Sequence, residues 1–175
     1  HVIHRHGLDS KTAFEVEAAL IDAYPSATNI AGGYNGDERG VMHADEIIER
    51  YEAPVADFQH NLVIINVNRT ASERSLYEAV RYAWKINPKK AEMAEYVLAA
   101  QRGLIVGAFE ATTWLPAIPE NFPGTTEPRE GRWGFIGHEA PLDIQKLYLR
   151  KRMPDSFRKK GAANPIRYAF ESIIQ

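Results

Sequence analysis

A short run of apolar, mostly β-branched residues near the middle of the chain constrains the fold more than any other feature. Residues 62–68 read Leu-Val-Ile-Ile-Asn-Val-Asn. A run of this length and composition is typical of a strand that is buried on both faces. We therefore expect the core to form around a central β-strand.

The segments that follow this run predict a mixed module over residues 59–175. A helix capped by Ser72 should turn Leu76, Val80, Ala83 and Trp84 toward the core, and a second helix should run from Pro88 to Gln101 and end at Gly103. The remaining expected elements are strands at 104–111, 132–136 and 166–170, a loop at 116–131 and a helix at 141–149. This order predicts an α+β fold with a curved mixed sheet.

Residues 1–52 predict a separate, smaller module. Residues 2–6 alternate like a strand, Asp9 or Ser10 can cap a helix over residues 11–24, and Pro25 stops that helix. A short helix is expected at residues 44–51. The seam between the modules is expected at residues 52–57, where Pro54 interrupts a polar stretch.

Charge is divided unevenly between the two halves of the chain, although the formal net charge is only -2. Residues 1–58 hold eleven acidic and four basic side chains, whereas residues 59–175 hold twelve acidic and seventeen basic ones. Residues 144–167 carry eight lysines and arginines and a single acid, Asp155. This asymmetry predicts either a patch that faces an anionic partner or a solvated helix face.

Several classes of protein are disfavoured by the sequence. Cysteine is absent, so disulfides and zinc–cysteine sites are excluded, and a reducing, cytoplasmic location is expected. No apolar run reaches the roughly 18 residues of a membrane span, so no membrane partner is expected. Neither a phosphate-binding loop nor a dinucleotide glycine motif nor a serine nucleophile elbow is present.

One acidic residue breaks the pattern of the first predicted helix. The apolar residues of segment 11–24 occupy one arc of the helix, and Glu17 falls inside that arc, near Ala13 and Leu20. A carboxylate in such a place is expected to be partly desolvated and to need a cation, a metal ion or hydrogen-bond donors. A structural ion pair, for example with Arg5, would satisfy it equally well.

The sequence around this helix contains an ordered set of motifs. Glu17-Ala18-Ala19-Leu20-Ile21 is followed by Asn29-Ile30 and then by Gly32-Gly33. This order resembles the C-terminal half of a GIY-YIG nuclease domain, in the bacterial branch that is similar to animal LEM-domain nucleases. The resemblance covers about residues 1–50, and it implies that this module is a remnant of a small α/β nuclease domain.

The resemblance implies roles for two residues. Glu17 would be a catalytic residue that holds a single Mg²⁺ or Mn²⁺ ion against the scissile phosphate, and Asn29 would brace the active site. The tyrosines and the arginine of that family would lie upstream of His1. We therefore expect the intact protein to be a metal-dependent endonuclease and the fragment that begins at His1 to be inactive by itself. His4 and His6 would at most contact phosphate.

The second module offers aromatic and basic residues that suit nucleic acid, DNA in the first place. Trp133 beside Arg132 could stack bases and bind phosphates, whereas Trp84 is expected to pack in the core. Asn164-Pro165 could aim Arg167 at a ligand from a rigid turn. The expected contacts to the nucleic-acid backbone are Lys151, Arg152, Lys159 and Lys160.

Residues 104–111 followed by Trp114 resemble PUA-like nucleic-acid reader domains, including readers of modified bases. Two alternatives to the endonuclease therefore stay open. The first is a non-catalytic nucleic-acid reader whose first module is a decayed nuclease domain. The second is a partner-binding protein whose basic stretch is only a solvated surface.

Overall fold

The computed structural model describes residues 5–24, 43–67, 75–157 and 165–170. The chain divides into two compact units, His1–Tyr51 and Glu52–Gln175. No helix in the described ranges is long and apolar enough to cross a membrane.

The described residues of the first unit form the helices α1 (Ser10–Ala23) and α3 (Ala44–Glu52). The last residue of α3, Glu52, already belongs to the second unit. Asp9 caps α1, because its Oδ1 accepts a hydrogen bond of 2.9 Å from the backbone N–H of Thr12. Both helices were expected from the sequence. Of the strand expected at residues 2–6, only Arg5 and His6 are described, and neither lies in a strand.

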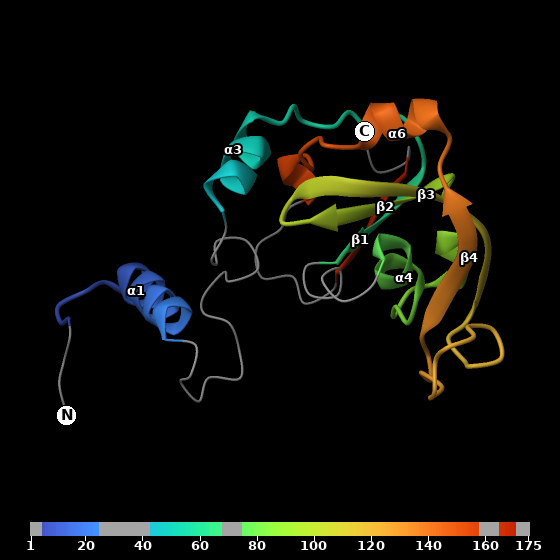
Figure 1. Cartoon of the computed structure of the whole chain (residues 1–175), viewed down its shortest axis with the longest axis horizontal. Coiled ribbons are helices and arrows are strands. Elements are labelled where there is room, and N and C mark those ends of the chain that lie inside the picture. Colours follow the sequence, from blue (N-terminus) through green and yellow to red (C-terminus); the bar gives the residue numbers. More distant parts are fainter. Residues whose placement is uncertain (1–4, 25–42, 68–74, 158–164, 171–175) are drawn as a thin grey trace. The chain divides into compact units, whose positions relative to one another are not determined.

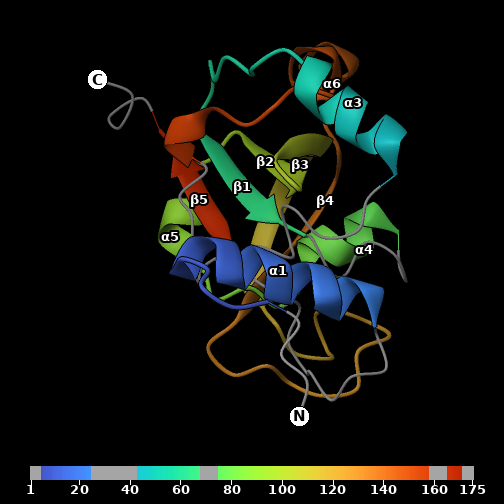
Figure 2. The ribbon, with the colours of Figure 1, turned by 90° about the vertical axis from the view of Figure 1, so that its left-hand side faces the viewer.

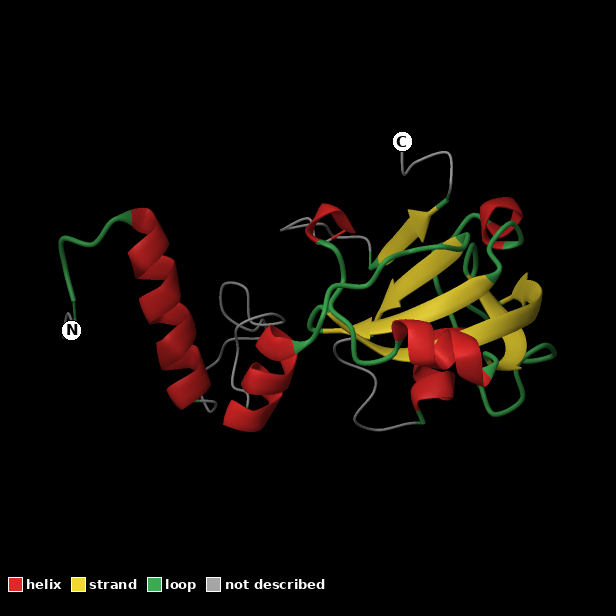
Figure 3. Cartoon of the chain, turned by 90° about the horizontal axis from the view of Figure 1, so that it is seen from above, coloured by secondary structure: helices red, strands yellow, loops and turns green. Residues whose placement is uncertain are grey.

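A five-stranded mixed sheet forms the centre of the second unit (Figure 1). Its strands are β1 (Leu62–Asn66), β2 (Tyr96–Gln101), β3 (Leu104–Pro116), β4 (Trp133–Glu139) and β5 (Ile166–Ala169), in the order β4-β3-β2-β1-β5. β1 and β2 are parallel, and the other neighbouring strands are antiparallel. The strands twist strongly and the sheet is curved (Figure 3). The predicted α+β fold is confirmed.

Apolar side chains cover both faces of the sheet. On one face, Leu62 and Ile64 of β1 pack with Ile144 and Tyr148 of α6 (Leu142–Tyr148), and we call this the α6 face. On the other, Val63 and Ile65 pack in one cluster with residues of α4 (Leu76–Arg81) and α5 (Pro88–Ala91), and we call this the α4 face. A 3-10 helix (Asp155–Phe157) follows α6, and β5 lies beside β1 (Figure 2). β1 is therefore the buried central strand that its composition predicted.

The prediction of one helix from Pro88 to Gln101 is wrong for the second half of that segment. α5 ends at Ala91, and Tyr96–Gln101 forms β2 between β1 and β3. A strand that is buried on both faces is apolar throughout, so its sequence also fits the apolar stripe of a buried helix. Pairing with two neighbouring strands outweighs the helical preference of Ala99 and Ala100, because tertiary contacts override intrinsic propensity.

Two further boundaries differ from the expected ones. The helix predicted to extend to Trp84, which is α4, ends at Arg81, because Ala83 adopts a left-handed conformation with φ of 68° and Trp84 pairs with β4. Ser75 caps it, and Ser72 lies outside the described residues. The expected seam at 52–57 belongs to the second unit, where Ala53 and Ala56 are buried.

Candidate nucleic-acid interface

Glu17, the residue expected to be partly desolvated, is exposed. No residue of α1 is buried, and Phe14 and Leu20 on its apolar arc are 48% and 41% exposed. An apolar arc implies burial only where another element packs on it, so the expectation of a desolvated Glu17 was wrong. Glu17 is correctly placed on a helix, but desolvation supplies no reason for it to hold a metal ion.

Of the other residues predicted for the nuclease module, only His6 lies in the described ranges. Asn29 and His4 lie outside the described residues, and His6 is exposed. Within residues 5–24, 43–67, 75–157 and 165–170, no three histidine, aspartate or glutamate side chains gather in a way that could hold a metal ion. The described residues therefore do not form a preorganised Mg²⁺ or Mn²⁺ site.

Two tryptophans lie opposite each other at the start of β4. Trp84 and Trp133 form an antiparallel bridge, in which each backbone N–H donates to the other residue's carbonyl at 2.9 Å. Residues directly opposite in an antiparallel pair project on the same side, and both indoles pack against the edge of the α4-face cluster. Both remain half-buried. The bridge thus presents two aromatic side chains at one place on the surface.

The two indoles have different roles. The Trp84 Nε1–H donates to the Val80 carbonyl at 2.6 Å, which fixes this ring against α4 and agrees with the structural role expected for it. No residue in the described ranges accepts a hydrogen bond from the indole N–H of Trp133. Trp133 is therefore the ring of the pair that has a polar group left for a ligand.

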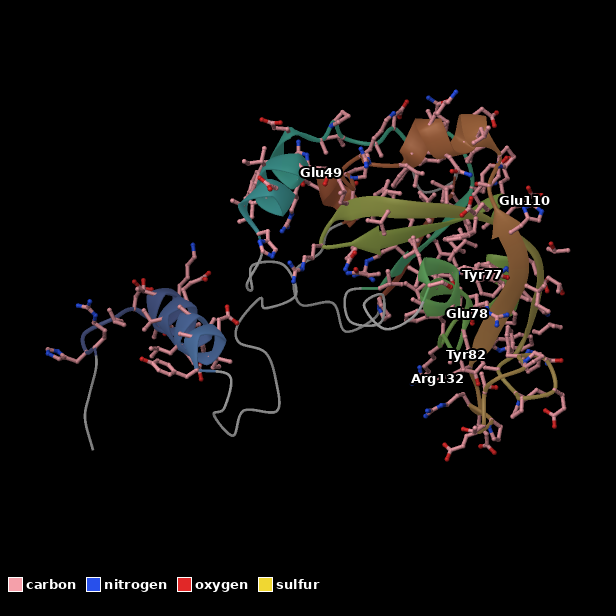
Figure 4. All side chains as sticks on the ribbon, viewed as in Figure 1. Glu49, Tyr77, Glu78, Tyr82, Glu110 and Arg132 are labelled. Carbon is pink, nitrogen blue, oxygen red and sulfur yellow. The ribbon has the colours of Figure 1, made fainter. Side chains whose placement is uncertain are left out.

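Arg132 is held beside this pair. Its Nη1 donates to the Ala83 carbonyl at 2.9 Å, and its side chain is exposed. A guanidinium has five N–H donors, so the remaining donors can reach a phosphate or a base edge. Figure 4 shows Arg132 and Tyr82 near each other beyond the end of α4.

A short basic segment continues from Trp84 across the α4 face toward β5. Residues 84–91 contain Lys85, Lys89 and Lys90 and no acidic residue. The backbone N–H of Asn87 donates to the Tyr168 hydroxyl on β5 at 3.4 Å, and the Lys90 ammonium lies 5.8 Å from the centre of the Tyr168 ring. We call Trp84, Lys85, Lys89, Lys90, Arg132, Trp133 and Tyr168 the aromatic–basic surface.

One carboxylate of α4 is paired with an arginine of the same helix. Glu78 of α4 forms an ion pair with Arg81, with 2.9 Å between Glu78 Oε2 and Arg81 Nη2. The Arg81 guanidinium also lies 5.3 Å from the centre of the Tyr77 ring. Lys85 and Lys89 are exposed, and neither pairs with an acid in the part of the chain that the structure describes.

Arg167, although predicted for the same interface, lies elsewhere. It pairs directly with Ile64 of β1, which places its side chain on the α6 face, at the edge of the sheet opposite to β4. Its Nη1 donates to the Ile166 carbonyl at 2.9 Å. Arg167 therefore cannot share one contact surface with Trp133.

Lys151 and Arg152 lie at the other end of β3 from Trp133. Arg152 bridges Val55 on one side and Leu104 on the other, and its Nε donates to the Ala53 carbonyl at 3.0 Å. Trp133 instead pairs with Pro116. Lys159 and Lys160 lie outside the described residues. Of the predicted nucleic-acid contacts in the described ranges, Arg132 and Trp133 are the two that lie together on one surface, with Lys151, Arg152 and Arg167 elsewhere.

A polar corner on the α6 face was missed by the sequence analysis. His60 Nδ1 lies 2.6 Å from the Tyr148 hydroxyl, which also accepts a hydrogen bond of 3.2 Å from the backbone N–H of Gln59. The rings of His60 and Tyr96 meet edge to face at 5.2 Å. Burial, and more weakly the charges of Glu95 and Asp57, raise the pKa of Tyr148. His60 and Tyr148 are 88 residues apart, so no local motif could have revealed the pair.

No protein-family model matches this chain, and no curated protein or solved structure matches it either.

Proposed function

We propose that the unit Glu52–Gln175 binds nucleic acid on its aromatic–basic surface. The observation that supports this most is the Trp84–Trp133 bridge, which holds a half-buried indole beside the exposed guanidinium of Arg132. Lys85 and Lys89 extend the positive charge along the same face. Nucleic acids present stackable rings and regularly spaced phosphates, and this surface offers partners for both.

The chemistry assigned to the surface is binding rather than bond cleavage. The lysines and Arg132 would neutralise phosphates and release counterions, so binding should weaken steeply as the salt concentration rises. Tryptophan faces would contact bases without reading a fixed sequence. This function is that of a non-catalytic nucleic-acid reader, and we assign it to the residues of the aromatic–basic surface.

The test is a salt titration of the full chain with fluorescently labelled oligonucleotides, followed by anisotropy. The double variant Lys85→Ala/Lys89→Ala should bind more weakly at low salt. It should also lower the slope of log K against log salt by up to about 1.4, because each lost phosphate contact on a single strand contributes about 0.7.

A matched control is Lys146→Ala, which removes an exposed lysine from α6, on the other face of the sheet. Its slope should equal that of the unchanged protein. Absence of binding at low ionic strength, or equal effects of the double variant and the control, would contradict the proposal.

Endonuclease activity remains a second proposal, and it rests on the resemblance of residues 1–50. The observation in its favour is that Glu17 lies on a helix, α1, as the resemblance requires. DNA as substrate, Mg²⁺ or Mn²⁺ as cofactor and a cytoplasmic location belong to the same proposal. If it is correct, a chain in which the tyrosine and arginine motifs of that family precede residues 1–50 should nick plasmid DNA, and Glu17→Gln should abolish nicking while Glu15→Gln does not.

A further inference from the structure

The backbone around Trp133 is fixed from several sides. Trp133 pairs with Pro116 of β3 on one side and with Trp84 on the other. The next residue, Gly134, is buried so tightly that a Cβ atom would lie 2.6 Å from the Arg81 carbonyl oxygen. A ring on such a support loses little conformational freedom when a ligand stacks on it.

The cations near this ring are arranged along a short path. From Trp84 to Asn87 the chain advances three residues, which is at most about 11 Å. Asn87 then contacts the Tyr168 hydroxyl, and Lys90 lies over the Tyr168 ring. Aromatic rings thus stand at both ends of the path, with Lys85 and Lys89 exposed between and beside them.

This arrangement suits unpaired bases better than a duplex. In a duplex the faces of the bases are covered by stacking, so an indole can reach one only after it has been unpaired or flipped out. Reading a major groove requires a protruding helix or ribbon, and the helices of this surface, α4 and α5, have only six and four residues.

We infer that the aromatic–basic surface binds single-stranded nucleic acid, with an unpaired base stacked on Trp133 and the flanking phosphates on Arg132, Lys85 and Lys89. This inference rests on the proposed function and specifies its substrate class. The shared chemistry is an unpaired base on a phosphodiester backbone, which single-stranded DNA and RNA both supply.

The experiment compares the full chain with Trp133→Leu and Trp133→Phe. Both variants keep an apolar side chain at the edge of the core, but only phenylalanine keeps a π face. Affinity for a single strand should fall at least about fivefold in Trp133→Leu and much less in Trp133→Phe, given what one stacked base contributes. Intrinsic tryptophan fluorescence should be quenched by the oligonucleotide, and this quenching should decrease in both variants.

The probes are a mixed-sequence single-stranded DNA, the same sequence as RNA, and its blunt duplex. Tighter binding of either single strand than of the duplex is expected, and the ratio of the two single strands identifies the sugar. If the duplex binds as tightly, or if leucine and phenylalanine behave alike, the single-strand inference is wrong. In that case the Lys85/Lys89 salt dependence would still support the proposed function, whereas absence of binding to all three probes would refute both.

Discussion

At the scale of single residues, Gly137 on β4 has no room for a side chain. A Cβ atom there would collide with the backbone carbonyl of Glu110, and the Gly137 N–H donates to the Tyr77 hydroxyl at 3.0 Å. The clash is with backbone, which cannot rotate away. We expect Gly137→Ala to lower the free energy of unfolding by about 1–3 kcal/mol, as other overpacked sites do.

Chemical denaturation of the full chain measures this effect. The neighbouring Ile136 is 40% exposed, so Ile136→Ala is a control in the same strand. It should lower the free energy of unfolding much less than Gly137→Ala does. Equal losses in the two variants would mean that the Glu110–Gly137 contact is not as tight as the structure shows.

Tyr148 allows a prediction about alkaline pH. Burial raises its pKa above the ordinary value of 10.0, so the folded protein holds this proton more tightly than the unfolded chain. The stabilisation is complete below pH 10 and is lost as the pH rises through the folded-state pKa. Tyr148→Phe also removes the hydrogen bonds to His60 and Gln59, so it should lower the free energy of unfolding by about 1 kcal/mol at pH 7.

Above pH 10 the difference between Tyr148→Phe and the unchanged protein should therefore shrink. Urea titrations at pH 7, 9 and 10.5 would show this. Tyr51→Phe, which changes a tyrosine that is 72% exposed, should have no effect at any of these values. A difference for Tyr148→Phe that stays constant across the series would argue against a raised pKa.

At the scale of elements, α1 depends on local interactions, because none of its residues is buried. Hydrogen bonds from the backbone N–H and the hydroxyl of Thr12 lower the pKa of Asp9 below 3.8. The charged cap therefore stabilises the helix at neutral pH and is lost as the pH falls through this lowered pKa.

Asp9→Ala should consequently fray the first turn of α1 at pH 7, whereas Asp9→Asn, which keeps an acceptor, should fray it less. The readout is the Cα chemical shifts of residues 10–13 in the full chain. Shifts that are the same in the alanine variant and the unchanged protein would show that the cap does not hold the helix.

The sequence predicted the elements that local chemistry determines. Asp9 and the helix after it, the apolar run that became β1, and α6 all have local signals, such as a cap residue or a continuous apolar stretch. β2 could not be distinguished from a helix, because its residues are apolar on both faces and only its pairing with β1 and β3 decides the matter.

The candidate site was less predictable than the fold. Arg132 and Trp133 are adjacent in sequence, so they were found together. Lys85 and Lys89 were missed because they become part of the surface only when Trp84 pairs with Trp133 across 49 residues of chain. The charge count of residues 144–167 pointed instead to Arg152, which bridges Leu104 at the start of β3, and to Arg167 on β5. The position of a charged residue in the sequence does not show which part of the folded surface it will occupy.

At the scale of the whole molecule, every buried apolar residue of the described ranges lies between Ala53 and Phe170. In the described ranges, all residues of the two core clusters on the faces of the sheet belong to the second unit. A chain of residues 52–175 should therefore unfold cooperatively, with the same urea midpoint as the full chain. All three tryptophans lie in this unit, so their fluorescence reports on both proteins equally.

A chain cut at the boundary expected from sequence, residues 59–175, is the informative comparison. It lacks Phe58, which is buried on the α6 face, and the Ala53 carbonyl that accepts from Arg152 Nε. It also lacks the backbone pairing of Ala56 and Pro54 with Arg152. Burial of one phenylalanine is worth about 1.5–3 kcal/mol, so this chain should unfold at clearly lower urea. Equal midpoints for the two shortened chains would show that residues 53–58 are a linker after all, and that Arg152 has no structural partner in them.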